Sequence, residues 1–111
     1  MTDHFGLKPD VIARINNVFA GFPEIGKVVL YGSRAMGTYR PGSDIDLTLV
    51  AAEGYGISLQ QLLALDEKLD DLLLPYTFDL SVLAEIDNPG LVDHIARVGQ
   101  VFYLKDECIR P

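Results

Sequence analysis

The stretch Leu30-Tyr31-Gly32-Ser33, followed after ten intervening residues by Asp44-Ile45-Asp46-Leu47, decides the fold of this chain and indicates its chemistry. Residues i and i+2 of a strand point to the same face, so we expect Asp44 and Asp46 side by side, with Ile45 on the opposite face. Two adjacent carboxylates repel each other unless a cation lies between them. Mg²⁺ typically binds one or two carboxylates together with substrate phosphates. The pair therefore predicts a magnesium site for nucleotide chemistry.

A third acid, Asp79, stands between Phe78 and Leu80 in a later strand-like segment. If the two strands are neighbours, about 4.8 Å apart, Asp79 lies opposite the first pair. Three carboxylates could then converge on two ions about 3.5–4 Å apart, as in two-metal phosphoryl transfer. We expect Asp44 and Asp46 to bind both ions, and Asp79 to hold the ion at the attacking hydroxyl and help remove its proton. Without metal, their repulsion should raise the pKa of at least one acid.

The alternative for the three acids is a solvated, exposed strand face. Aspartate is a poor strand former, so three of them on matching faces would be costly if they served solubility alone. The pattern therefore favours a metal site over surface decoration.

Gly32 and Ser33 form a turn between a strand and a short predicted helix that ends at Met36. Ser33 is the expected N-cap, and backbone N–H groups at such a turn bind phosphate. The P-loop spacing from Gly32 to Gly37 is present, but Thr38-Tyr39 follows where Lys-Ser/Thr is required, and no G-x-G-x-x-G occurs. Alone, the turn could be an ordinary one; followed by Asp-x-Asp, it predicts a phosphate site.

Hydrophobic periodicity and end signals predict an α/β (α+β) fold, with about four strands in one sheet and helices packed on its apolar face. Ser58 with Gln61 forms a capping box, Pro75 ends that helix, and Asn88-Pro89 begins the last one. Strands are expected at 27–31, 44–50, 77–82 and 101–104, and helices at 9–20, 33–36, 58–74 and 89–98.

Length and composition set further limits. With 111 residues we expect a single domain, 1–111, with no room for a separate substrate domain. The net charge of −7 and the pI near 4.5 disfavour direct binding of nucleic acid. No apolar run approaches the ~18 residues of a membrane span and no leader is evident, so we expect a cytoplasmic protein. The single Cys108 excludes an internal disulfide.

Several polar residues outside these motifs carry weaker signals. His94 lies beside Asp93 and Arg97 in the last predicted helix, and we expect it to be exposed rather than to act as a ligand. The acids of the third predicted helix form a charged face that solvation would explain, although a basic partner surface would explain it too. The acids are Asp66, Glu67, Asp70 and Asp71.

The motifs resemble the signature of the DNA polymerase β-like nucleotidyltransferase superfamily, and within it the minimal nucleotidyltransferase (MNT) family. The resemblance rests on the segments 30–37, 43–47 and 78–80 and covers nearly the whole chain. It implies the nucleotidyltransferase fold with a mixed sheet. It also implies that Gly32 and Ser33 bind the β- and γ-phosphates of ATP, with Arg34 as a further nucleotide contact.

The resemblance implies a partner as well. MNT proteins form complexes with helical HEPN-domain proteins, and as antitoxins they transfer AMP from ATP to a tyrosine of the HEPN ribonuclease. The expected function is therefore a Mg²⁺-dependent nucleotidyltransferase that modifies a HEPN partner. Two alternatives are an antitoxin that neutralises its partner by contact alone and a small-molecule adenylyltransferase, for which the chain length leaves little room.

Overall fold

The computed structural model describes residues 5–105, which are built around a mixed sheet of four strands. In the order β3-β2-β1-β4, β1 pairs antiparallel with both of its neighbours, while β2 and β3 pair in parallel. The strands are β1 (Ile25–Tyr31), β2 (Ile45–Ala51), β3 (Phe78–Val82) and β4 (Gln100–Leu104). The prediction of a mixed sheet of about four strands is confirmed.

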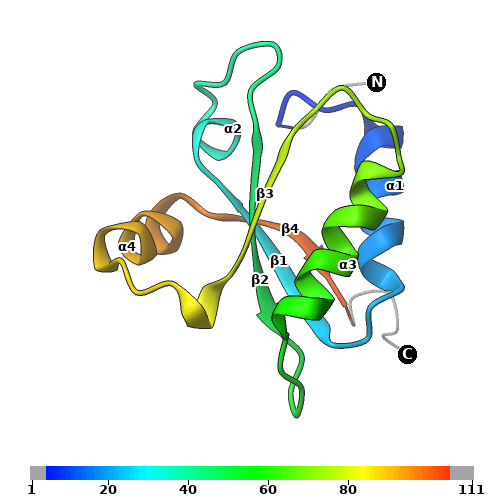
Figure 1. The fold of residues 1–111 in the computed structure, drawn as a ribbon. Coiled ribbons are helices and arrows are strands. Elements are labelled where there is room, and N and C mark those ends of the chain that lie inside the picture. The colour runs from blue at the N-terminus through cyan, green and yellow to red at the C-terminus, as the bar shows by residue number, and fades with distance from the viewer. Residues whose placement is uncertain (1–4, 106–111) are drawn as a thin grey trace, which may run out of the picture.

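Helices lie on both sides of this sheet (Figure 1). The helices α1 (Pro9–Ala20) and α3 (Leu59–Asp70) run side by side over one face, where they contact each other. On the other side, α4 (Pro89–Val98) contacts β1. The short helix α2 (Ser33–Met36) follows β1, and a 3-10 helix, η1 (Leu83–Glu85), follows β3. The apolar face is thus covered by α1 and α3, while α4 is brought to the polar face.

Alternation along the strands separates the two faces of the sheet. Leu30, Leu47 and Leu80 are register partners across β1, β2 and β3, and they point into the core beneath α1 and α3. Tyr31, Asp46 and Asp79 form the adjacent row, which faces the other way. The side chains with no exposure at all are those of Leu7, Ile15, Phe19, Val28, Leu30, Ile45, Leu47, Thr48 and Leu49.

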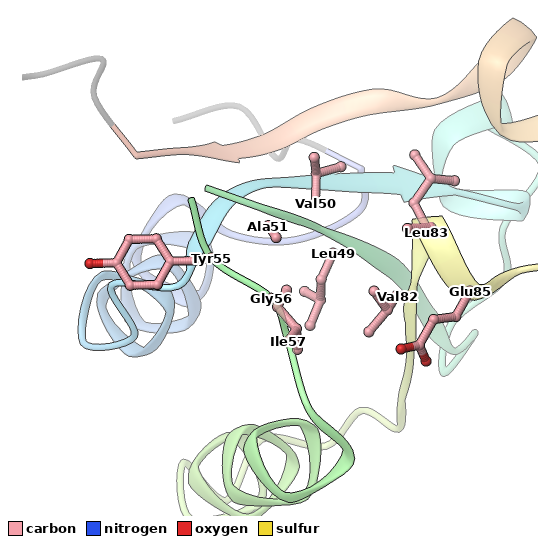
Figure 2. A pocket seen from close by; sticks show the side chains of 10 residues that line it. Leu49, Val50, Ala51, Tyr55, Gly56, Ile57, Val82, Leu83 and Glu85 are labelled. Atoms are coloured by element: carbon pink, nitrogen blue, oxygen red, sulfur yellow. The ribbon is translucent and has the colours of Figure 1, made fainter. Parts of the chain in front are cut away.

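An apolar cavity of about 410 Å³ lies at the C-terminal ends of β2 and β3 (Figure 2). Leu49, Ile57 and Val82 line its floor, and Glu85 brings one carboxylate to it. The predicted acids lie at the opposite ends of these two strands, because Asp44 precedes β2 and Asp79 is the second residue of β3. The hollow is therefore separate from the polar site described below.

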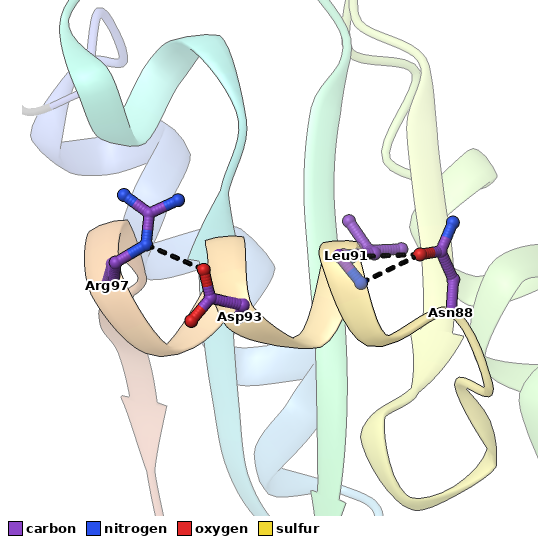
Figure 3. Close-up of polar contacts among 5 residues, drawn as sticks. Asn88, Leu91, Asp93 and Arg97 are labelled. Atoms are coloured by element: carbon purple, nitrogen blue, oxygen red, sulfur yellow. Dashed lines mark hydrogen bonds and ion pairs between the residues drawn. The ribbon is translucent and has the colours of Figure 1, made fainter.

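Two helices begin at side-chain caps that the sequence predicts. Ser58 and Gln61 form the reciprocal capping box of α3, with hydrogen bonds of 2.7 and 3.1 Å. At α4, Asn88 Oδ1 accepts hydrogen bonds from the N–H groups of Gly90 and Leu91, at 2.9 and 3.2 Å (Figure 3). These caps satisfy amides that have no partner within a helix, and they fix where each helix starts.

Element boundaries differ from the predictions by one to a few residues. The strand β2 begins at Ile45, so Asp44, expected as its first residue, lies just outside it. The helix α3 ends at Asp70 instead of continuing to Pro75, because Leu73 has a φ of 55° and cannot continue a right-handed helix. The strand β1 extends back to Ile25, which pairs with Ala51 across an irregular register.

Two expectations concern the membrane and the cysteine. None of the helices formed by residues 5–105 combines the length and apolar character needed to cross a membrane. Cys108 lies outside the described residues.

Candidate active site

The parallel pairing of β2 with β3 sets Asp46 directly beside Asp79. The antiparallel pairing of β1 with β2 sets Tyr31 on the other side of Asp46. All three side chains belong to one row on the polar face, since register partners in a sheet share a face. The expected juxtaposition of Asp46 and Asp79 is therefore present, and it depends on a pairing between residues that are far apart in the sequence.

Asp44 belongs to the site in a different way. It is exposed and lies one residue before β2, outside the ladder that contains Asp46. The next residue, Ile45, anchors this point because its N–H donates to the Thr77 carbonyl, 2.8 Å away. Asp44 thus sits at the entry of the strand, close enough to Asp46 to affect its charge.

The electrostatics of the row centre on Asp46. Partial burial raises the pKa of Asp46 above its ordinary value, and the carboxylates of Asp79 and Asp44 raise it further. The positive charge of Arg34, and that of His94 in its protonated form, act in the opposite direction and are smaller effects. The raised pKa agrees with the expected repulsion among the three acids. A cation at this point would relieve that repulsion.

The donor set of the three acids suits a hard cation. Within residues 5–105, no group of three or more His, Cys, Asp and Glu side chains is arranged so that it could hold a metal ion. The three aspartates supply only oxygen atoms, and they lie on the polar face around Asp46. Mg²⁺ completes its shell with water and substrate phosphates, so an open carboxylate set fits Mg²⁺ better than it fits a metal that needs an all-protein cage.

Gly32 brings the backbone of the turn close to the carboxylate of Asp46. It has a φ of 77° and a ψ of −154°, a combination essentially reserved for glycine. A Cβ at this position would overlap Oδ2 of Asp46, so only glycine lets the turn approach the carboxylate this closely. The N-cap of α2 is Gly32, with no side-chain cap, and Ser33 is the first helical residue. The expectation that Ser33 is the N-cap was wrong, because the close approach requires glycine there.

Arg34 is held inside the protein, with 3% of its surface exposed. Its Nε and Nη2 donate to the Ser43 carbonyl at 3.2 and 2.9 Å, and its Nη1 donates to the Phe5 carbonyl at 2.8 Å. The guanidinium also lies over the rings of Tyr39 and Tyr76, 5.2 and 5.1 Å from their centroids. These contacts make Arg34 a buried support of the loop that leads into Asp44, and its role as a nucleotide contact stays a prediction.

His94 belongs to the site, although we expected it to be exposed. It is half-buried, and its Nε2 accepts a hydrogen bond of 3.2 Å from the Gly32 N–H. Its ring lies edge-on to Tyr31, with 6.2 Å between centroids. Its neighbours Asp93 and Arg97 are exposed and pair at 2.9 Å (Figure 3). The sequence carries no signal for His94, because its contact depends on how α4 packs against β1.

Tyr31, at the other end of the row, is buried with 8% of its surface exposed. Burial raises the pKa of Tyr31; a hydrogen bond with Ser81 lowers it, and the charges of Asp79 and Asp46 raise it. The phenol therefore stays protonated and forms a neutral wall beside the carboxylates.

Comparison with known proteins identifies the family to which this fold belongs. The family model described as "Polymerase beta, Nucleotidyltransferase" matches residues 13–108, most of the chain. The chain therefore belongs to this nucleotidyltransferase family. None of the curated proteins compared with the sequence matches it significantly.

Solved structures share the fold. A toxin–antitoxin complex crystallised with AMP-PNP contains a chain with a TM-score of 0.68 and 22% identity, covering 87% of this chain and 76% of that one. A complex of a tri-AMPylated Shewanella oneidensis HEPN toxin with its MNT antitoxin has a chain with a TM-score of 0.62 and 19% identity, covering 89% and 74%. A protein described as a minimal nucleotidyltransferase gives 0.61 and 27% identity, covering 82% and 91%.

Proposed function

We propose that this protein is a Mg²⁺-dependent adenylyltransferase that moves AMP from ATP to a tyrosine hydroxyl of a HEPN-domain partner, and that it acts as the antitoxin of that partner. The observation that carries the proposal is the pairing of Asp46 with Asp79, with Asp44 at the entry of the same strand. Three acids at this point of a nucleotidyltransferase fold are the groups that such a reaction needs.

The metal would be held by Asp44, Asp46 and Asp79. When bound, Mg²⁺ would neutralise phosphate charge and stabilise the attacking and leaving oxygens; two ions would divide these tasks. The chain would hold the β- and γ-phosphates at the turn of Gly32 and Ser33, where glycine permits close approach and the first amides of α2 lack helical partners. Buried Tyr31 and half-buried His94 would limit the access of water from the side of α4.

The reaction consists of one displacement at the α-phosphorus. The oxygen of the acceptor hydroxyl forms a bond to that phosphorus while the bond to the bridging oxygen of pyrophosphate breaks. Pyrophosphate leaves, and Asp79 accepts the hydroxyl proton as a general base. Asp79 is exposed, unlike the half-buried Asp46, so it is the acid that an incoming protein side chain would reach.

The proposed partner follows from the solved structures. Two of the similar chains occur in toxin–antitoxin complexes, one crystallised with AMP-PNP and one containing a tri-AMPylated HEPN toxin. These complexes support ATP as the donor and a HEPN protein as the acceptor.

The test is to incubate the purified protein with its co-expressed HEPN partner, ATP and Mg²⁺, and to measure the mass of the partner. We expect one or more additions of AMP with the wild type and none with the Asp44→Asn/Asp46→Asn double variant. A matched control, Asp87→Asn/Asp93→Asn, also removes two acids, here both exposed and outside the site, and it should transfer AMP normally. An unchanged mass with the wild type would refute the enzymatic proposal.

The same experiment distinguishes the two alternatives. If the site double variant still neutralises the toxicity of the partner in cells as well as the wild type does, contact alone is the mechanism. If the isolated chain adenylylates a small hydroxylated molecule and leaves the partner unmodified, the acceptor is a small molecule.

A further inference from the structure

The helix α4 reaches the proposed nucleotide turn through one side chain. His94 Nε2 accepts the N–H of Gly32 across 62 residues of sequence, and its ring rests edge-on against Tyr31. These contacts connect α4 both to the turn and to the row of acids. His94 lies outside the Gly-Ser and Asp-x-Asp motifs from which the site was predicted.

The position of α4 is fixed at both of its ends. At its start, Pro89 and the Asn88 cap define the first turn (Figure 3). At its end, a Cβ on Gly99 would lie 2.7 Å from Val29 Cγ1, so the helix terminus lies close against β1. Ile95 is buried beside His94, with 5% of its surface exposed. His94 therefore comes from a rigid support rather than from a mobile surface.

Another side of α4 faces solvent. Asp93 and Arg97 pair there, with about two thirds of each side chain exposed. They supply control positions that lie on the same helix as His94 but not next to the turn.

The chemistry of the imidazole suits the role of an acceptor. A ring nitrogen that accepts a hydrogen bond carries no proton, so the neutral tautomer here has its proton on Nδ1. The Gly32 peptide needs such a partner, because glycine permits many backbone orientations and a half-buried N–H without an acceptor is costly. With the Gly32 N–H taken by His94, the amide and hydroxyl of Ser33 would be the groups of the turn left for a phosphate.

We propose that His94 is a positioning residue of the nucleotide site: by accepting the Gly32 N–H, it fixes the peptide of the turn so that the triphosphate is bound at Ser33, next to Asp46. This inference rests on the proposed function, in which the turn binds the phosphates of ATP. His94 acts through Gly32 and does not take part in the chemical step. Its loss should therefore weaken the binding of nucleotide more than it slows the turnover of bound nucleotide.

Three substitutions separate the hydrogen bond from the shape of the ring. Gln places an amide oxygen near the position of Nε2, so His94→Gln should keep the bond. Asn carries the same amide one methylene shorter, so His94→Asn should lose it. His94→Phe keeps a ring against Tyr31 but has no acceptor. Arg97→Ala, on the exposed side of α4, is the matched control.

Two measurements apply to every variant, and thermal unfolding confirms that each is folded. The first is hydrogen exchange of the Gly32 amide by NMR, which needs no ligand. The second is the affinity for AMP-PNP with Mg²⁺ by calorimetry, with KM for ATP and kcat measured on the partner. We expect the Asn and Phe variants to lose protection of the Gly32 amide, to bind AMP-PNP about five- to twentyfold more weakly and to raise KM with little change in kcat. The Gln variant should stay within about threefold of the wild type.

The outcomes can be told apart. If the Phe and Asn variants bind AMP-PNP as tightly as the wild type, the role of His94 is refuted while the proposed function stands. Equal losses in the Gln, Asn and Phe variants would also refute it, because the hydrogen bond would then not be the cause. A wild-type protein that binds no AMP-PNP overturns the proposed function, whatever the Gly32 exchange rates show.

Discussion

Asp46 of β2 and Asp79 of β3 are register partners in the parallel pair of the sheet, so two carboxylates lie directly opposite each other on one face. Like charges placed in this way destabilise a sheet, by about 0.2–1 kcal/mol. Burial and the nearby Asp44 add to the effect and raise the pKa of Asp46. The pair therefore lowers the stability of the fold at the point where a cation and a triphosphate would bind.

The first prediction follows from that repulsion. In a buffer free of divalent cations at pH 7, Asp46→Asn should raise the thermal midpoint by about 2–5 °C, because it removes one of the opposed charges. The same variant should lose AMP transfer. Differential scanning calorimetry measures the shift, and Asp93→Asn, which removes an exposed acid outside the site, should leave the midpoint almost unchanged. A midpoint that falls in Asp46→Asn would show that the carboxylate stabilises the fold.

The second prediction concerns pH without metal. The pKa of Asp46 is raised in the folded state, so this group contributes stability below its unfolded pKa and loses it as the pH rises through the folded value. The stability advantage of Asp46→Asn over the wild type should therefore be absent at strongly acidic pH and grow as the pH rises. Urea unfolding at a series of pH values measures this difference. A constant advantage across the series would contradict the raised pKa.

Magnesium should reverse the order of thermal stability of the wild type and the variants that lack site carboxylates. We expect millimolar Mg²⁺ to raise the midpoint of the wild type at pH 7 and to have little effect on Asp44→Asn/Asp46→Asn, because a ligand that binds only the folded state stabilises it. The gain should shrink as the pH falls, since protons compete with the metal for the carboxylates. Na⁺ at matched ionic strength is the control for screening. An equal gain in both proteins would place the ion elsewhere.

A pair of glycines tests the close approach of the turn. Gly32 and Gly37 both have φ near 78°, but a Cβ on Gly32 would overlap Asp46, whereas a Cβ on Gly37 meets no atom within 4 Å. Gly37→Ala should cost about 1 kcal/mol of unfolding free energy from backbone strain and keep its activity. Gly32→Ala should lower the unfolding free energy by about 1–3 kcal/mol more than Gly37→Ala does, and it should abolish AMP transfer. Equal effects of the two substitutions on activity would contradict this account.

Arg34 provides the last prediction. Arg34→Lys keeps the charge but loses the planar fork that reaches two carbonyls, so we expect a loss of about 2–4 kcal/mol in unfolding free energy. Arg14 makes one exposed hydrogen bond, to the Leu72 carbonyl, and Arg14→Lys should change stability by less than about 0.5 kcal/mol. Urea denaturation of both variants gives the comparison. Similar stabilities would mean that the loop before Asp44 is held by other contacts.

The sequence by itself determined the parts of this protein that depend on neighbouring residues. Alternation along 45–49 separates Leu47 from Asp46, because side chains in a strand switch faces at every residue. The capping box at Ser58 and the Asn88 cap are equally local, since each cap bonds to amides two or three residues away. The meeting of Asp46 with Asp79 was predicted only on the condition that their strands are neighbours, and the parallel pairing of β2 with β3 meets that condition.

Only the tertiary structure decided which distant groups complete the site. Arg34 bonds to Phe5, 29 residues away, and His94 bonds to Gly32, 62 residues away, and no local pattern encodes either contact. The first depends on where the chain around Phe5 lies relative to α2, and the second depends on how α4 packs against β1. The physical reason is the distance along the sequence over which each interaction acts. Backbone geometry acts over two to four residues, whereas these hydrogen bonds form only after the hydrophobic surfaces of helix and sheet have come together.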